Sequence, residues 1–157
     1  MARQTRATLA LARTGFAFTV LTYAYDPTAD SIGLHAAAAL GEPPGRVLKT
    51  LIAEVDGKPV CTILASDRSI AMKRLAAALG GKSAAMMPPA KAERLTGYKV
   101  GGISPLGQRH AVPTFLDSAA IDEPHVFVNG GQRGLQIRLS PADLAAATGA
   151  RVVHLTA

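Results

Sequence analysis

The spacing of apolar and polar positions in the first half of the chain predicts helices, a strand and a hairpin. The helical segments, each followed by a glycine within two positions, are residues 5–13, 31–40 and 69–79. Residues 16–25 alternate apolar and polar side chains, which is typical of a strand. Two further apolar segments, residues 47–55 and 59–65, flank Asp56-Gly57-Lys58 and are therefore predicted to form a β-hairpin.

The second half of the chain alternates short apolar segments with turn residues. A helix is predicted to open at Pro88-Pro89 and to stop before Gly97, and another to begin at Ser140-Pro141. Residues 98–116 read as a turn-rich strand region, and further short strands are predicted at residues 112–116, 126–128, 134–139 and 151–155. About seven strands and four helices, joined mostly by hairpins, predict an α+β fold. We expect a single domain over residues 1–157, with a mixed, mostly antiparallel sheet and surrounding helices.

Composition supports a folded, soluble domain. The 157 residues are 48% hydrophobic and 18% charged, which is typical of a globular chain rather than a disordered tail. The only cysteine, Cys61, excludes a disulfide framework and is predicted to be a core residue of its strand. No apolar run has the roughly 20 residues of a membrane span. The basic N-terminus is followed by a segment that Arg13 and Gly15 interrupt, unlike a signal peptide, so a cytoplasmic location is expected.

The net charge of +6 comes from 17 basic and 11 acidic side chains spread evenly along the chain. Residues 1–80 carry 9 basic and 6 acidic groups and residues 81–157 carry 8 and 5, so each half is +3. A basic surface favours a polyanionic partner. The stacking aromatic residues of single-strand binders are not evident in the sequence.

Several common catalytic sites are excluded by spacing. Gly81-Lys82-Ser83 resembles the end of a phosphate-binding loop, but Ala76 stands where that loop needs a glycine. No Gly-x-Ser-x-Gly nucleophile motif is present. The four histidines are too scattered for a predictable metal site: His35, His110, His125 and His154. We therefore expect neither a metal nor a cofactor.

Two features remain as candidates for chemistry. Lys49 lies within an apolar segment, so it is either an edge-strand lysine that extends into water or a partly enclosed ammonium that holds an anion or a polarised carbonyl oxygen. Two glycine-rich segments, residues 101–107 and 129–134, are either tight turns or loops whose N–H groups line an oxyanion or ribose-phosphate site.

These residues also carry a family resemblance. Lys49-Thr50-Leu51, the string Gly-Gly-Ile-Ser-Pro-Leu-Gly at residues 101–107, Pro-Thr-Phe-Leu-Asp at 113–117 and Asn-Gly-Gly-Gln-Arg-Gly at 129–134 resemble the YbaK family of aminoacyl-tRNA deacylases. That family is related to the editing insertion domain of bacterial prolyl-tRNA synthetases. The likeness extends from Thr22 to Leu144, which is nearly the whole chain.

The resemblance implies hydrolysis of the ester that joins an amino acid to the 3′ end of tRNA, most closely Cys-tRNA(Pro) and also Cys-tRNA(Cys). Assistance by the substrate's own thiol would explain why no protein nucleophile is visible, and would allow classification as a lyase. The implied partners are the acceptor end of the acylated tRNA and prolyl-tRNA synthetase, with no membrane or DNA.

By matching positions, the resemblance implies catalytic roles for Lys49, which would bind the substrate or its oxyanion, and for the backbone of Gly101. The residues implied in substrate binding are Tyr23, Thr50, Gly102, Ser104, Asn129, Gly130, Gly131 and Gln136.

Asn129 and Gln136 depart from the family pattern, because many members have Ser and an acidic residue at these two positions. Two alternatives therefore stay open beside the cysteine-specific deacylase. One is a deacylase for another small amino acid, alanine or serine, and the other is a non-catalytic module that binds tRNA or a synthetase.

Overall fold

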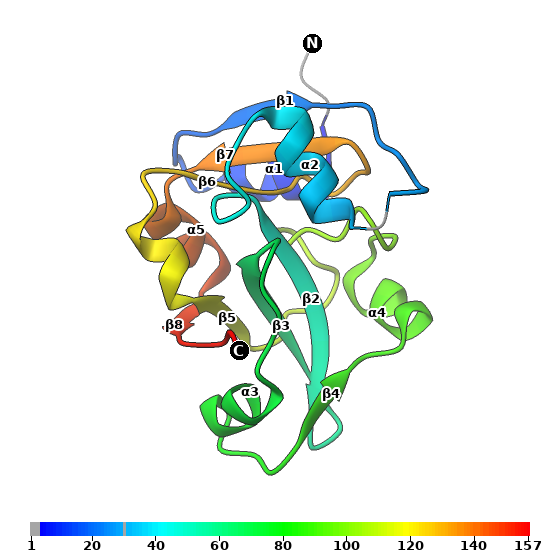
Figure 1. Cartoon of the computed structure of the whole chain (residues 1–157), viewed down its shortest axis with the longest axis vertical. Helices are drawn as coiled ribbons and strands as arrows, with labels where there is room; N and C mark the ends of the chain where they lie inside the picture. The colour runs from blue at the N-terminus through cyan, green and yellow to red at the C-terminus, as the bar shows by residue number, and fades with distance from the viewer. Residues whose placement is uncertain (1–3, 30) are drawn as a thin grey trace.

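Two β-sheets organise the chain in a computed structural model that describes residues 4–29 and 31–157. The predicted α+β class is confirmed, while the single predicted sheet is divided into a five-stranded and a three-stranded one (Figure 1). The first three residues of the N-terminus, considered above as a targeting segment, lie outside the described residues, as does Asp30. None of the helices in the described ranges has the length and apolar character needed to cross a membrane.

The five-stranded sheet is built around the predicted hairpin. β2 (Leu48–Val55) and β3 (Lys58–Ala65) pair antiparallel along their whole length. Asp56 and Gly57 adopt positive φ angles of 51° and 81° between them, as a two-residue Asp-Gly turn requires. The other strands are β4 (Ala84–Met86), antiparallel to β2, and β5 (Thr114–Asp117) and β8 (Arg151–Val153), which extend the sheet in parallel beyond β3.

The three-stranded antiparallel sheet lies at one end of the hairpin, at the top of Figure 1. Its strands, in spatial order, are β1 (Thr19–Thr22), β7 (Leu135–Leu139) and β6 (Val126–Asn129). A parallel bridge between Val47 and Phe127 connects the two sheets just before β2 begins. Residues from both sheets therefore come together at the first residues of β2.

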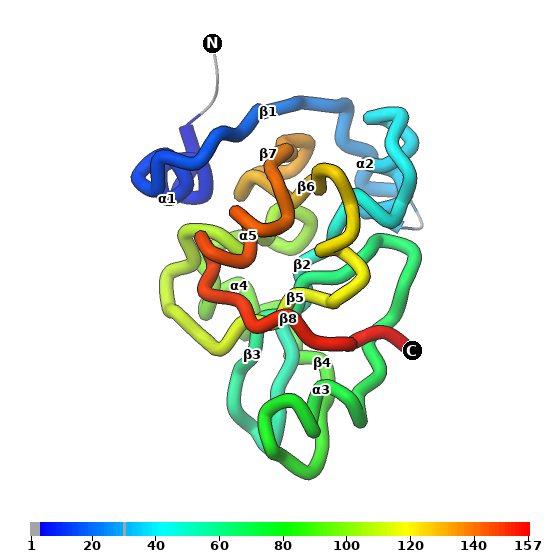
Figure 2. The backbone as a smooth tube through the Cα atoms, turned by 90° about the vertical axis from the view of Figure 1, so that its left-hand side faces the viewer, coloured from blue at the N-terminus to red at the C-terminus, as the bar shows by residue number. Residues whose placement is uncertain are grey.

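Five α-helices and a short 3-10 helix surround the sheets in the described ranges: α1 (Arg6–Ala12), α2 (Ile32–Leu40), α3 (Met72–Ala78), α4 (Pro89–Thr96), α5 (Pro141–Thr148) and η1 (Ser118–Asp122). Figure 2 shows α1 and α2 on either side of the three-stranded sheet. The predicted cap of α2 is confirmed, because Ser31 Oγ accepts from Leu34 N–H at 3.3 Å. Gly41 ends this helix with a φ of 69°.

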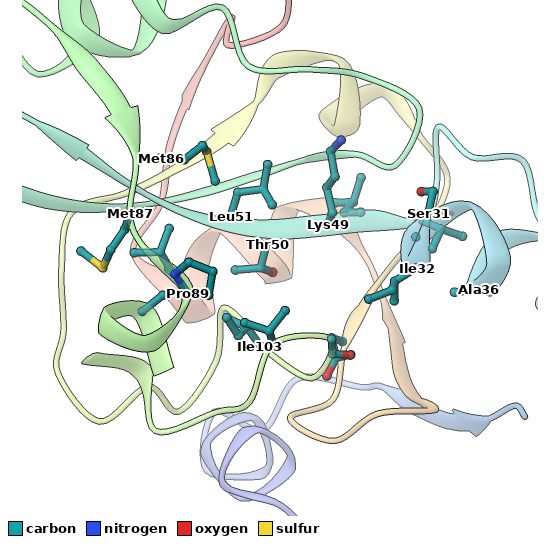
Figure 3. A pocket seen from close by; sticks show the side chains of 18 of the residues that line it. Ser31, Ile32, Ala36, Lys49, Thr50, Leu51, Met86, Met87, Pro89 and Ile103 are labelled. Carbon is teal, nitrogen blue, oxygen red and sulfur yellow. The ribbon is translucent and has the colours of Figure 1, made fainter. Parts of the chain in front are cut away.

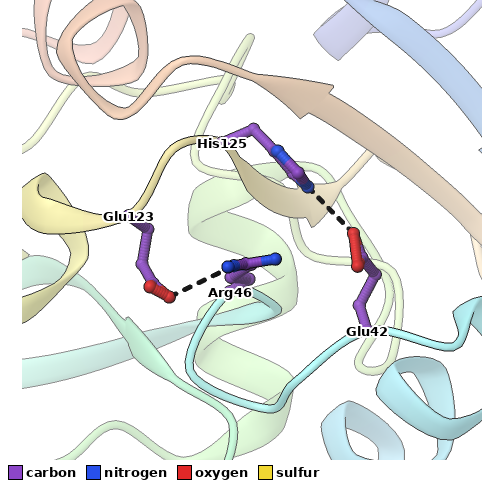
Figure 4. A network of polar contacts seen from close by, with 4 residues as sticks. All are labelled: Glu42, Arg46, Glu123 and His125. Carbon is purple, nitrogen blue, oxygen red and sulfur yellow. Dashed lines mark hydrogen bonds and ion pairs between the residues drawn. The ribbon is translucent and has the colours of Figure 1, made fainter.

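Two polar side-chain contacts connect the segment between α2 and β2 to the segment that leads into β6 (Figure 4). Arg46 Nε lies 3.3 Å from Glu123 Oε1, and His125 Nε2 lies 2.9 Å from Glu42 Oε1. Alongside them, Phe127 N–H donates to the Arg46 carbonyl oxygen at 2.8 Å. Side-chain and backbone contacts together fix the position where β2 starts.

The buried core rests mainly on aliphatic side chains, as the low aromatic content predicts. One cluster packs between α1, the three-stranded sheet and α5, and it includes Leu11, Val128, Ile137 and Leu144. Cys61 is fully buried in a separate cluster, and burial raises the pKa of its thiol to about 12. The prediction of a core cysteine is confirmed, because such a thiol stays neutral and out of reach of solvent.

One prediction of local structure is wrong, and one strand was not predicted. Residues 98–113 form a loop rather than a strand region, and side chains satisfy part of its backbone: Tyr98 OH donates to the Leu106 carbonyl oxygen at 2.5 Å. A segment with this many glycines and prolines does not supply the continuous ladder of a strand. The strand β4 was not predicted, because its three residues, Ala-Ala-Met, show no alternation and pair only with residues 53–55.

Candidate functional site

A cavity of about 340 Å³ opens beside β2, where α2, the start of α4 and the loop around Gly101 approach one another (Figure 3). Binding sites for small molecules commonly have volumes of roughly 300–1,000 Å³, so this cavity has the size of a ligand site. Five of the ten residues singled out from the sequence line it: Lys49, Thr50, Gly101, Asn129 and Gln136. Residues more than eighty positions apart in the chain therefore share one site.

The walls of the cavity are largely apolar. The apolar lining comes from α2, β2, the β4–α4 segment and the loop after Gly101, and it includes Ile32, Leu51, Met86, Met87, Pro89 and Ile103. Met87 is buried, whereas Met86 is 45% exposed. A cavity with apolar walls and few polar groups suits a ligand whose side chain is small and weakly polar. The low local dielectric also strengthens the electrostatic interactions of any charge inside the cavity.

Two buried oxygens in this cavity have no hydrogen-bond partner among the described residues: Thr50 Oγ1 and Gln136 Oε1. Gln136 is only 4% exposed. Leaving such a group unpaired costs about 1–3 kcal/mol, and buried side-chain polar atoms are therefore normally paired. Both oxygens therefore lack, within the described residues, the hydrogen bonds that a donor could supply.

Lys49 lies at the rim of the cavity, and Figure 3 shows its side chain leaving β2 on the opposite side from Thr50. The Lys49 side chain makes no hydrogen bond or ion pair with residues 4–29 or 31–157. Partial burial lowers the pKa of Lys49, and the nearby carboxylate of Asp67 partly offsets this effect. β3 pairs with one edge of β2, and β4 pairs with the other edge only at residues 53–55. The edge of β2 near Lys49 is therefore not covered by β4. The ammonium is thus half-enclosed and unpaired.

Gly101 has a backbone that only glycine adopts readily here. Its φ is +89°, and a β-carbon would lie 2.8 Å from the hydroxyl oxygen of Tyr25. The Gly101 N–H makes no hydrogen bond to any part of the chain that the structure describes. A free N–H at the cavity wall has the chemistry of a donor to a carbonyl oxygen or an oxyanion.

Asn129 holds the two glycine-rich segments together. Its Nδ2 donates to the Gly101 carbonyl oxygen at 3.0 Å. Its Oδ1 accepts from Gly131 N–H at 2.7 Å and from Gln132 N–H at 3.2 Å. A serine hydroxyl carries its donor and its acceptor sites on one oxygen, whereas the longer Asn129 amide carries them on two separate atoms, so the departure from the family pattern has a structural consequence.

Tyr23 lies next to the cavity rather than in its lining. Its hydroxyl is buried and has no hydrogen-bond partner of good geometry among the described residues. Burial raises the pKa of Tyr23, an effect that the neighbouring Gln136 side chain partly opposes. Its ring packs at a tilt against His35, with 5.8 Å between ring centroids.

The four other predicted site residues lie behind the cavity and shape its loops. Ser104 is fully buried, and its Oγ accepts from Leu106 N–H at 3.2 Å. β-carbons at Gly102 and Gly131 would lie 3.1 Å from Arg133 N and 2.8 Å from the Tyr98 ring. The fourth residue is Gly130, whose carbonyl oxygen accepts from Thr5 Oγ1 at 2.5 Å.

Sequence reasoning missed the apolar residues that complete the cavity. Met86, Met87 and Pro89 reach the site because β4 pairs with β2 and delivers the start of α4 beside it. The available signal was the Met86-Met87 pair, which lies just before the helix predicted to open at Pro88-Pro89 and belongs to no predicted helix or strand. Within the described ranges, no three His, Cys, Asp or Glu side chains converge as metal ligands would.

Comparison with known proteins assigns this chain and its fold to a class. The sequence profile of the aminoacyl-tRNA editing domain matches residues 26–147, which is most of the chain. The chain therefore belongs to the aminoacyl-tRNA editing domain family, and its resemblance to the YbaK deacylases is confirmed.

Individual relatives agree with this assignment. EbsC of Enterococcus faecalis, described as a candidate Cys-tRNA(Pro)/Cys-tRNA(Cys) deacylase, is 34% identical over 122 residues, which are 76% of this chain and 74% of EbsC. A proline–tRNA ligase of Nitratidesulfovibrio vulgaris is 33% identical over 84 residues, 54% of this chain but only 15% of the ligase. The crystal structure of a candidate trans-editing enzyme for prolyl-tRNA synthetase matches with a TM-score of 0.85 and 25% identity, over 99% of both chains.

Proposed function

We propose that the protein hydrolyses the aminoacyl ester of mischarged tRNA, with Cys-tRNA(Pro) as its main substrate and Cys-tRNA(Cys) as a second one. The observation that carries this proposal is the cavity itself, which combines a half-enclosed ammonium with a backbone N–H and two buried oxygens that have no partner among the described residues. The deacylase description of EbsC, and its identity of 34% to this chain, support the choice of substrate. We place the activity in the cytoplasm, where tRNA is charged.

In this proposal the ester carbonyl lies at the open edge of β2, where the Lys49 ammonium approaches it from one face of the strand and Gly101 from the other. The ammonium and the Gly101 N–H donate to the carbonyl oxygen and stabilise the negative charge that develops on it. Thr50 Oγ1 and Gln136 Oε1 accept from the α-ammonium group of the substrate and so orient the amino acid. The apolar walls take the side chain.

The nucleophile in this proposal is the thiol of the bound cysteine. Its sulfur attacks the ester carbonyl, a carbon–sulfur bond forms, and the carbon–oxygen bond to the ribose breaks. The thiol proton passes to the ribose oxygen that leaves, and water later opens the cyclic thioester to release cysteine. Cys61 of the protein does not compete for this role, since it is fully buried with a thiol pKa of about 12.

A panel of mischarged tRNAs tests the proposal with the wild type and Lys49→Ala. We expect cysteine to be released far faster than serine, because the serine hydroxyl is a poor intramolecular nucleophile. Lys49→Ala should lower the rate roughly 100- to 1,000-fold, the usual loss when one oxyanion donor is removed. Lys58→Ala is the matched control, because Lys58 is an exposed lysine next to the hairpin turn and does not line the cavity. Full activity of Lys49→Ala would remove this lysine from the mechanism.

A deacylase for alanine is the second candidate function, and the apolar walls favour it, because they fit a methyl group as well as a thiol. Faster release of alanine than of cysteine in the same panel would establish it. Prolyl-tRNA synthetase is the partner we propose for delivery of the tRNA. Its addition should raise the selectivity for tRNA(Pro) over tRNA(Cys), and an unchanged ratio would contradict delivery.

A further inference from the structure

Tyr25 and Arg133 form a cation–π pair beside the cavity. The guanidinium carbon of Arg133 lies 5.4 Å from the centroid of the Tyr25 ring. Arg133 Nε and Nη2 both donate to the Val100 carbonyl oxygen, at 3.0 and 2.9 Å. The ring and the carbonyl together hold the guanidinium plane in one orientation.

This pair adjoins the position where the ester would react. A β-carbon at Gly101 would lie 2.8 Å from Tyr25 Oη and 3.3 Å from Arg133 Nε. Val100, whose carbonyl binds the guanidinium, lines the cavity and is 39% exposed. The Tyr25–Arg133 pair therefore lies at the opening of the cavity to solvent.

Arg133 is exposed, and none of the three ion pairs found in the described residues includes it. No carboxylate in that part of the chain therefore neutralises the Arg133 guanidinium. A guanidinium plane fixed on an aromatic ring is a stacking surface for nucleic-acid bases, and its positive charge also attracts phosphate. Since the orientation is set in advance, little side-chain entropy is lost when a base stacks on it.

We infer that Tyr25 and Arg133 form a platform on which the terminal adenine of the acylated tRNA stacks while the ester lies in the cavity. This inference rests on the proposed function for the position of the ester at Gly101. The terminal ribose then spans the short distance between Gly101 and the platform. A stacking surface recognises the flat face of any base, so the platform positions the 3′ end without reading the tRNA sequence.

Binding of two acceptor-stem RNA hairpins tests the platform. Each carries cysteine through a stable amide at its 3′ end; one ends in adenosine and the other in the same sugar without a base. Fluorescence anisotropy should show that the wild type binds the adenosine hairpin about tenfold more tightly, as expected for one stacked base. Arg133→Lys keeps the charge but removes the plane, and Tyr25→Leu removes the supporting ring. Both variants should bind the adenosine hairpin only as tightly as the wild type binds the hairpin without the base.

Arg151→Lys is the matched control. Arg151 also lies over an aromatic ring, with its guanidinium carbon 5.6 Å from the Phe115 centroid, but it belongs to β8 and not to the cavity lining. It should keep the tenfold difference, and so should Tyr25→Phe, which retains the ring.

Equal binding of the two hairpins by the wild type would overturn the platform, as would an unchanged difference in Arg133→Lys or no detectable binding of either hairpin. Deacylation of charged tRNA, measured separately, decides the proposed function. Hydrolysis without base-dependent binding would remove only the platform, whereas base-dependent binding without hydrolysis would remove only the proposed reaction.

Discussion

Asn129 and Gln136 are direct partners across β6 and β7, and both line the cavity, yet their side-chain amides are used in opposite ways. The Asn129 amide makes three hydrogen bonds, to Gly101, Gly131 and Gln132. Gln136 is almost completely buried, and its Oε1 has no partner among the described residues. Two chemically similar groups on one strand pair therefore differ in whether the fold itself satisfies them.

The difference in hydrogen bonding indicates different functions for the two amides. A saturated amide stabilises the folded chain and fixes the positions of the groups it binds. An unsaturated one costs stability until a ligand supplies the missing partner, which makes it a recognition group. We accordingly interpret Asn129 as a positioning residue for Gly101 and Gln136 as a contact for the substrate.

Among the variants that test this comparison, the largest effect is expected from Asn129→Ala. The substitution leaves the N–H groups of Gly131 and Gln132 and the carbonyl of Gly101 without their partner, so unfolding free energy should fall by about 1–3 kcal/mol. The rate constant for deacylation should fall about tenfold, because Gly101 loses its fixed position. Urea denaturation and single-turnover kinetics measure the two effects.

Two variants sharpen this test. Asn129→Asp keeps the acceptor for Gly131 and Gln132 but loses the donor to Gly101. Its unfolding free energy should therefore fall less than that of Asn129→Ala, while its deacylation rate constant should fall as much. Gln136→Met should keep its stability and raise KM instead. A normal rate in Asn129→Asp would show that the bond to Gly101 is not needed.

The same contrast exists between two threonines, and a smaller effect is expected there. Thr62 Oγ1 donates to the Leu51 carbonyl oxygen at 2.8 Å, whereas Thr50 Oγ1 has no partner in the described part of the chain. Thr50→Val should therefore raise unfolding free energy by up to about 1 kcal/mol, while Thr62→Val should lower it by a similar amount. Thr50→Val should also raise KM several-fold. Equal destabilisation by both substitutions would mean that the Thr50 hydroxyl is paired in solution.

Local signals made part of this structure predictable. The β2–β3 hairpin follows from Asp-Gly between two apolar segments, and the cap of α2 follows from Ser31. The division into two sheets could not be predicted, because the parallel pairs of β3 with β5 and of β5 with β8 join segments far apart in sequence. A strand region was predicted in place of the loop at residues 98–113, because its apolar residues pack into the core without forming the hydrogen bonds of a β-sheet.

The candidate site was predictable to a similar extent. Glycine-rich strings and family resemblance pointed to Gly101 and Asn129, because a required backbone conformation leaves a mark in the sequence. Arg133 lies in one of these strings, but its pairing with Tyr25 left no such mark, since it depends on how the turn before β7 packs against the chain after β1. The hydrogen-bond saturation of Asn129 and the free oxygen of Gln136 likewise arise only from tertiary packing.

The smallest effect is expected from Tyr23→Phe, which removes the third buried oxygen that has no partner among the described residues. Burial raises the pKa of Tyr23 above its usual 10.0, so on alkaline titration the unfolded chain loses this proton before the folded one does. The Tyr23 contribution to wild-type stability is therefore complete below about pH 10 and declines as the pH rises further.

Tyr23→Phe lacks this decline in stability. The other tyrosines titrate in both proteins, so their effects cancel when the two proteins are compared. Urea denaturation from about pH 8 to about pH 11 should show the variant gaining on the wild type only at the alkaline end. Parallel curves over the whole range would place the Tyr23 hydroxyl in contact with solvent or with a partner that stabilises its anion.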